Sequence, residues 1–206
     1  MIRDLDRTIE ELLRRELSAA LVEQVAISFA PPDNEFPPPD VKTPAVNLFL
    51  YDIRENTDLR EGQWALERRA DGSAYRIRNS VRVDCSYLIT AWSSEGATSR
   101  WLEEHHLLSE VMRALLRHPT IPGVLLRGGL LGQEPPLPAS TLQPGRLQSP
   151  AEFWQALGGK PKAALHYTVT IGVVPDGEFP AEAPVIEKVL KFPPETPEEA
   201  LAKGSR

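Results

Sequence analysis

Residues 81–92 read VRVDCSYLITAW, and this pattern is the main guide to the fold of the chain. Its odd positions, from Val81 to Ala91, are mostly apolar and alternate with more polar residues such as Arg82 and Thr90. A period of two predicts a strand with one buried face and one more polar face, as in an antiparallel or mixed sheet. Residues 165–173 repeat this alternation. Residues 46–53 are apolar on nearly both faces, which predicts a central strand.

Helices are expected on either side of these strands. Residues 2–17 carry apolar side chains three and four positions apart, which predicts one apolar stripe on a helix. A second helix is expected from Ser99 to Arg117, with Trp101 and Leu116 on the apolar face that covers the sheet. A short third helix follows, capped by Ser149 with a proline in its first turn.

The remaining segments complete an α+β domain. Residues 21–29 are predicted to form a strand, and residues 30–44, with six prolines, a long surface loop. The expected fold class is therefore α+β, with a mixed or antiparallel sheet flanked by helices.

Composition limits the classes of function. The length of 206 residues suits one domain with an appendage, and the net charge of −6 argues against a general nucleic-acid binder. No apolar stretch approaches the roughly 18 residues of a membrane span, and the N-terminus does not resemble a signal peptide. We therefore expect a protein made in the cytoplasm, with no nucleic-acid partner and no membrane insertion.

No catalytic, metal or cofactor site is expected either. The single cysteine, Cys85, lies on the apolar side of its strand, where a buried thiol acts as a small hydrophobe. His105 and His106 are adjacent, and neighbours on a helix point about 100° apart, whereas zinc motifs place histidines at i and i+4. The glycines of residues 125–132 lack the lysine and the strand-to-helix context of a phosphate loop. The expected role is non-enzymatic.

A hairpin is predicted within residues 63–80, because Asp71-Gly72 separates two β-prone runs. The hairpin carries a local basic patch on an acidic protein, made of Arg68, Arg69, Arg76 and Arg78. These arginines are candidates for contact with an acidic partner protein. The alternative is a solvated hairpin with scattered charge.

The C-terminal segment is predicted to lie outside the domain. Residues 1–174 form the domain, and residues 175–206 form a Pro-rich extension with a short apolar arm at 184–192. So short an arm cannot build its own core, and it is expected to lie on another surface, often as an added strand. An arm folded back on its own domain is the alternative. The candidate contact residues are Val185, Ile186, Val189, Leu190 and Phe192.

A polar stretch follows the predicted central strand. Arg54 and Glu55, with Asp52 and Asn56 beside them, are candidates for ion pairs between subunits. A turn stabilised by local side-chain hydrogen bonds is an equally good interpretation.

Four segments, in this order, resemble a known family. They are MIRDLD (1–6) with LLR (12–14), VNLFLYDIREN (46–56), DCSYLITAW (84–92), and LLRHP (115–119) with PAEFWQALG (150–158). Together they are similar to the cap, or tail-terminator, proteins of extracellular contractile injection systems, the phage-tail-like particles of the antifeeding-prophage and virulence-cassette type.

This resemblance implies a phage tail-terminator-like fold and a structural role. It implies a ring, expected to be a hexamer of this chain, that contacts the inner tube protein and the contractile sheath protein. The ring ends their polymerisation and stabilises the extended sheath, in a particle that is released or tethered to a membrane. The family has no catalytic or metal motif. The alternatives are a tail-completion or connector protein of a phage, and a monomeric accessory binding module.

Overall fold

The computed structural model describes residues 1–60, 62, 64–68, 74–133, 136–143, 147, 149–175 and 178–180. The chain forms two compact units. The larger one holds residues 1–63 and 79–176, and the smaller one holds residues 64–78 with the chain from 177 onward. The predicted domain boundary after residue 174 stays a prediction.

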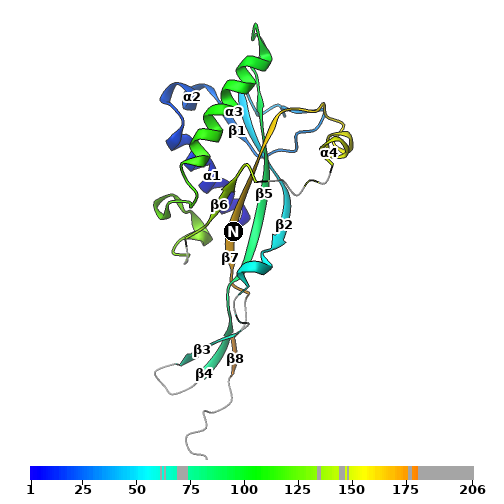
Figure 1. Cartoon of the computed structure of the whole chain (residues 1–206). Coiled ribbons are helices and arrows are strands. Elements are labelled where there is room, and N and C mark those ends of the chain that lie inside the picture. Colours follow the sequence, from blue (N-terminus) through cyan, green and yellow to red (C-terminus); the bar gives the residue numbers. More distant parts are fainter. Residues whose placement is uncertain are drawn as a thin grey trace, which may run out of the picture. The chain divides into compact units, whose positions relative to one another are not determined.

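A five-stranded mixed sheet organises the larger unit (Figure 1). Its strands, in spatial order, are β1 (Ala26–Ser28), β2 (Ala45–Glu55), β5 (Val81–Trp92), β7 (Ala164–Val173) and β6 (Ala139–Thr141). β1 pairs in parallel with β2, and the other pairs are antiparallel. The expected α+β class with a mixed sheet is confirmed. The long strand at residues 81–92 lies in the middle of the sheet.

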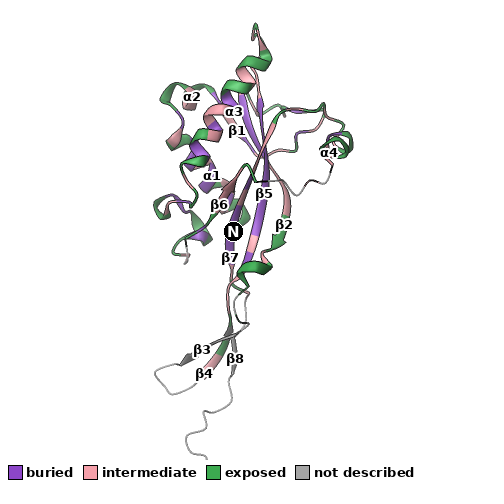
Figure 2. Ribbon diagram, in the orientation of Figure 1, coloured by how far each residue is buried: buried purple, intermediate pink, exposed green. Residues whose placement is uncertain are grey.

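Three helices cover one face of this sheet, and a fourth lies on the other (Figure 1). The first group is α1 (Ile2–Glu16), α2 (Ala19–Gln24) and α3 (Arg100–Leu116), and the fourth is α4 (Pro150–Ala156). The core forms between α1, α3 and the sheet, where Leu5, Ile9, Tyr87, Val111 and Tyr167 are all inaccessible to solvent (Figure 2). The apolar face of the alternating strands and the apolar stripe of α1 therefore pack against each other, as predicted.

The predicted strand at residues 21–29 is wrong in its first half. Residues 19–24 form α2, which follows Ser18 at the N-cap position, and only Ala26–Ser28 form a strand. The sequence AALVEQ consists mostly of good helix formers, and parallel pairing with β2 occupies just three residues. The loop at 30–44 has no helix or strand, as predicted, but it buries Phe36 against Trp92 with ring centroids 4.4 Å apart.

The apolar face of α3 is narrower than the sequence indicates. Leu107, Leu108, Val111, Ala114 and Leu115 are buried. Trp101 is 61% exposed and Leu116 is 51% exposed, which corrects their predicted place on the covering face. Both lie at the ends of the helix, outside the stretch from Leu107 to Leu115 that holds its buried side chains.

The smaller unit is a three-stranded sheet. β3 (Trp64–Arg68) pairs antiparallel with β4 (Ala74–Arg78), which confirms the predicted hairpin, while its turn at 69–73 lies outside the described residues. β8 (Glu178–Pro180) pairs antiparallel with the other edge of β4. Three residues of the C-terminal extension thus belong to a sheet with the hairpin.

Among the described helices, none has the length and apolar character needed to cross a membrane.

Candidate partner interface

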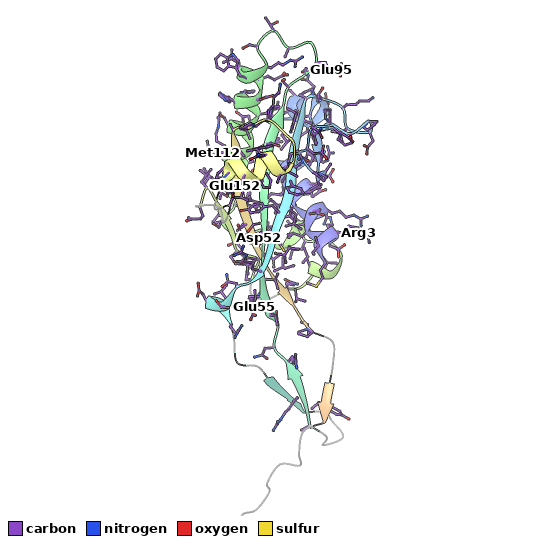
Figure 3. All side chains as sticks on the ribbon, turned by 90° about the vertical axis from the view of Figure 1, so that its right-hand side faces the viewer. Arg3, Asp52, Glu55, Glu95, Met112 and Glu152 are labelled. Atoms are coloured by element: carbon purple, nitrogen blue, oxygen red, sulfur yellow. The ribbon has the colours of Figure 1, made fainter. Side chains whose placement is uncertain are left out.

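The polar end of β2 is held by bonds within the chain. Arg54 contacts both carboxylate oxygens of Asp52, at 2.9 and 2.8 Å. Glu55 accepts two hydrogen bonds from Arg60, at 2.8 and 2.9 Å, and this contact lowers the pKa of Glu55. Asp52 and Glu55 lie at the same end of the sheet in Figure 3. A turn stabilised by local side-chain bonds, the alternative interpretation of this stretch, therefore accounts for its charges. Contact between subunits through Arg54 and Glu55 stays a prediction.

Asn56 joins this end of β2 to a buried polar cluster on the second face of the sheet. Its side-chain oxygen accepts from the Leu59 amide and caps the short 3-10 helix η1 (Thr57–Leu59), while its nitrogen donates to Asp84 at 3.0 Å. Asp84 is only 5% exposed and also accepts from Thr170 at 2.7 Å. Charge-assisted bonds of this kind hold β2, β5 and β7 together. This face is polar, as the alternation predicts, but part of it is buried from solvent.

Helix α4 covers another part of the second face with aromatic side chains. The Ser149 hydroxyl accepts a hydrogen bond from the Glu152 amide at 3.2 Å, as predicted for an N-cap. Phe153 packs on Phe49 and Tyr51, and Trp154 is 5% exposed. The Tyr51 hydroxyl lies 3.3 Å from Nδ1 of His166, whose pKa is lowered by burial. This helix therefore packs on the sheet through its aromatic side chains.

The predicted basic patch is described in part. Arg76 and Arg78 are exposed on β4, two residues apart and opposite Leu66 and Trp64 in the strand register. Arg68 is placed in β3 by its backbone, and Arg69 lies outside the described residues. The apolar arm at 184–192, with Val185, Ile186, Val189, Leu190 and Phe192, also lies outside them. The partner roles of these residues stay predictions.

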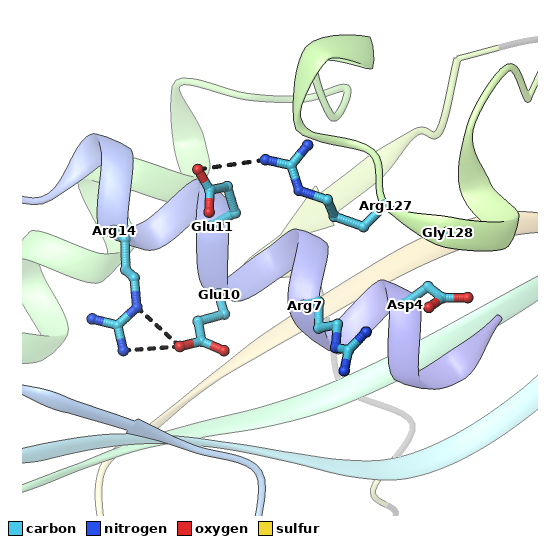
Figure 4. Close-up of a pocket in the computed structure, with 7 residues that line it drawn as sticks. All are labelled: Asp4, Arg7, Glu10, Glu11, Arg14, Arg127 and Gly128. Atoms are coloured by element: carbon cyan, nitrogen blue, oxygen red, sulfur yellow. Dashed lines mark hydrogen bonds and ion pairs between the residues drawn. The ribbon is translucent and has the colours of Figure 1, made fainter.

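A charged groove that the sequence analysis did not single out runs along α1 (Figure 4). Glu10 pairs with Arg14 at 2.8 Å, and Glu11 with Arg127 at 3.6 Å, whereas Arg7 makes no ion pair with any residue that the structure describes. The spacing of positions 3, 7, 10 and 14 on one helix face is the signal that reveals this stripe in the sequence. The groove encloses about 370 Å³ and is lined by Asp4, Arg7, Glu10, Glu11, Arg14, Arg127 and Gly128.

The loop beside this groove is fixed by Asp4. Its carboxylate accepts a hydrogen bond from the Gly129 amide at 3.1 Å, and this bond is the main reason why the pKa of Asp4 is lowered. Gly128 has φ of +54°, and a Cβ there would lie 2.5 Å from the Asp4 carboxyl group. The glycines at 128–129 therefore allow the close approach of α1 to this loop.

Exposed apolar side chains gather around a second hollow, of about 380 Å³. Its rim holds Met1, Leu131 and Val174, which are 39%, 65% and 60% exposed. Gly129, Gly132 and Gly172 also line it, and Ser80 and Gln133 supply polar groups. Exposed clusters of large apolar side chains are typical of surfaces that contact another protein.

The described residues contain no cluster of three or more metal-binding side chains. His105 is exposed and contacts the Trp101 ring edge-on at 5.8 Å. Cys85 is buried, and its pKa is raised to about 11, mainly by burial and also by the charges of Asp84 and Asp6. The thiol therefore stays protonated near neutral pH.

Comparison with known proteins gives a family and a fold. Residues 4–188 match the family described as the Pvc16 N-terminal domain. One similar structure is the sheath/tube terminator of the PVC extracellular contractile injection system in its extended state. It shares 24% identity and a TM-score of 0.65, over 98% of this chain and 69% of that one. Another is the tube-terminating cap of the anti-feeding prophage, with 24% identity and a TM-score of 0.63, over 95% of this chain and 64% of that one. The chain thus spans about two thirds of the length of these two proteins. No curated protein matches it.

Proposed function

Because the chain belongs to the Pvc16 N-terminal domain family, we propose that it is a non-enzymatic cap of a contractile injection system. In this role it binds the end of the inner tube and sheath and stops further polymerisation. The observation that carries the proposal is the match over residues 4–188, which includes both the five-stranded sheet and the hairpin. Two similar structures are themselves terminators or caps.

A cap needs surfaces that its own fold does not consume. The face of the sheet toward α1 and α3 is used by the core. The hairpin arginines Arg76 and Arg78 and the hollow rimmed by Leu131 and Val174 remain exposed. These are the surfaces that we assign to partners, with Arg54 and Glu55 as further candidates at the end of β2.

We propose that the cap is a ring, expected to be a hexamer. A ring closed by heterologous contacts uses two different surfaces on every subunit, so its contacts are satisfied within the circle. Such a ring occupies the end of the tube without offering an equivalent end for another layer. It also ties neighbouring sheath subunits together and stabilises the extended sheath. The protein is then assembled in the cytoplasm and becomes part of a phage-tail-like particle.

Deletion of the gene, followed by electron microscopy of the particles, tests this function. The expected result is tubes and sheaths of uncontrolled length, or sheaths that contract prematurely. Re-expression of the full chain should restore uniform particles. Particles of normal length with normal ends in the deletion strain contradict the proposal. Light scattering during size-exclusion chromatography of particle-free protein measures the mass of the ring, and a strictly monomeric component of finished particles contradicts the ring.

A further inference from the structure

The outer edge of β7 is covered by β6 and the residues beside it as far as Thr170. In an antiparallel strand every second residue turns its backbone N–H and C=O groups to the same side. On this side β6 pairs with residues 167–169, and the Leu142 amide donates to the His166 carbonyl at 3.0 Å. The Thr170 amide donates to the Pro138 carbonyl, also at 3.0 Å. The next position that faces this edge is Gly172.

At Gly172 the edge is closed by a single side chain, that of Gln133. The Gln133 amide nitrogen donates to the Gly172 carbonyl at 2.6 Å, and the Gln133 side-chain oxygen accepts from the Gly172 amide at 2.9 Å. A neighbouring antiparallel strand makes the same pair of bonds with an edge residue. The glutamine side chain therefore takes the place of a strand at this position.

The backbone at residue 172 is closely surrounded. A Cβ there would lie 2.5 Å from the Ser80 hydroxyl oxygen, 3.3 Å from a guanidinium nitrogen of Arg82 and 3.5 Å from the Gln133 side-chain oxygen. Glycine is the residue that lets side chains approach the backbone this closely. The bonds from Gln133 are thus part of a packed arrangement around Gly172.

The other edge of the sheet is protected in a different way. β1 pairs with residues 45–47 of β2. Farther along β2, the register shifts between Leu50 and Asp52, and the last residues, Arg54 and Glu55, are charged and exposed. Irregular pairing and exposed charges both discourage a sheet edge from pairing with another chain.

The end of β7 has no such protection of its own. Residues 171–174 read IGVV, with no charge and no proline, and Val174 is 60% exposed. Uncharged, apolar edges with high strand propensity are the ones that add a strand from another chain. Two identical edges can pair antiparallel with each other about a twofold axis. Without Gln133 this end of β7 would therefore be a favourable edge for pairing.

We propose that Gln133 closes the β7 edge against the same edge of a second copy of this chain. The proposal rests on the cap function, because a ring holds copies side by side, where a high local concentration strengthens even a weak contact. Pairing of two β7 edges is isologous and ends in a dimer, whereas a ring needs two different surfaces on each subunit. Gln133 thus excludes a contact that competes with closure of the ring.

Hydrogen–deuterium exchange of the full-length protein, resolved to single amides, tests whether Gln133 closes the edge. Gln133→Met keeps a side chain of similar length and removes both bonds to Gly172. We expect the Gly172 amide to exchange about tenfold faster or more, because it loses its hydrogen-bond acceptor, while the Thr170 amide stays protected. Gln155→Met is the matched control, because Gln155 is an exposed glutamine on α4, and it should change neither amide.

Gln133→Glu separates the hydrogen bonds from simple filling of space. At pH 7 its carboxylate still accepts from the Gly172 amide, but it has no hydrogen to donate to the Gly172 carbonyl, so protection should fall. At pH 4 and below, a protonated carboxyl group supplies the missing O–H donor. The protection factor of Gly172 should then return toward that of the native protein, whereas Gln133→Met should show no recovery.

Sedimentation velocity over a range of protein concentrations tests whether a second copy is kept away. We expect Gln133→Met to form heavier species than the native protein, in a share that grows with concentration, and Gln155→Met to match the native protein. Equal exchange of the Gly172 amide in Gln133→Met and in the native protein would show that Gln133 does not close the edge. Faster exchange with unchanged sedimentation would show that no second copy pairs there. Either result overturns the proposal, and both leave the cap function standing, because the particle length after deletion of the gene tests that function separately.

Discussion

Two buried tyrosines opposite each other in the central sheet offer a sharp test of the packing. Tyr87 and Tyr167 are paired in the register of β5 and β7, and both are fully inaccessible to solvent. The Tyr87 hydroxyl donates a hydrogen bond to Asp6 of α1 at 2.8 Å. The Tyr167 hydroxyl has no hydrogen-bond partner among the described residues. Replacement by phenylalanine thus removes the same atom from two different environments.

The structure sets the expected cost of each change. The bond from Tyr87 ends on a carboxylate, and hydrogen bonds to charged groups contribute about 1.5–3 kcal/mol to folding stability. We therefore expect Tyr87→Phe to lower the free energy of unfolding by that amount at pH 7. For a chain of this size the shift in Tm is roughly 3–12 °C. Tyr167→Phe should leave stability unchanged or raise it slightly, because it removes a buried hydroxyl that makes no bond.

Asp6 makes the cost of Tyr87→Phe depend on pH. Burial raises the pKa of Asp6, and the bond from Tyr87 partly opposes that rise. A carboxyl group whose pKa is raised by folding contributes stability below its unfolded pKa, and this contribution is lost as the pH climbs through the folded value. Without Tyr87 the pKa of Asp6 rises further, so the variant loses more stability on going from pH 4 to pH 7 than the native protein does.

Urea unfolding monitored by circular dichroism at pH 4 and pH 7 measures both effects. The penalty of Tyr87→Phe should be about 1 kcal/mol larger at pH 7, the difference between a charged and a neutral bond. In an Asp6→Asn background that pH dependence should disappear. Equal penalties for Tyr87→Phe and Tyr167→Phe, or a Tyr87→Phe penalty that does not change with pH, would refute this account of the contact between α1 and the sheet.

Three further predictions concern single sites in the larger unit. Cys85 should resist aromatic disulfide reagents at pH 8 in the folded protein and react once per chain in denaturant, and fast labelling of the folded protein contradicts its burial. Gly128→Ala should cost more stability than Gly132→Ala: both glycines have positive φ, worth about 1–2 kcal/mol, but only at 128 does a Cβ meet Asp4. Equal unfolding midpoints for these two variants would show that Asp4 does not hold the loop closely. Ser149→Ala should lower stability by about 1 kcal/mol in urea unfolding through loss of the N-cap, whereas an unchanged midpoint would mean that α4 is held by its aromatics alone.

The sequence predicted those elements in which a single physical pattern acts. The alternation at residues 81–92 and 165–173 follows from burial of one face, and the stripe of α1 follows from the helical period. Prediction was wrong where two patterns compete. Residues 19–24 are apolar enough for a strand, but their helix propensity prevails because β1 needs no more than three residues to pair with β2.

The candidate interface was harder to predict, because its side chains are arranged by strand register. The shift between Leu50 and Asp52 sets the pairing of the last part of β2 with β5, and no local pattern in the sequence reveals it. Trp101 follows the helical period of α3 but lies at its first turn and is exposed, which the period alone does not reveal. Likewise, the hollow unites Met1, Leu131 and Val174, whose distance in sequence hides their proximity.

Because β7 comes late in the chain, the five-stranded sheet can be completed only late in synthesis. β5 ends at Trp92 and its partner β7 begins at Ala164, so all of residues 93–163 must be made between them. At about 5–20 residues per second a ribosome needs roughly 4–14 seconds for that stretch. Until β7 has been made and has docked, β5 lacks one of its two partner strands, and contacts this distant in sequence form slowly. The edge of β5 that pairs with β7 is therefore closed late in folding, and until then it is open to pairing with other strands.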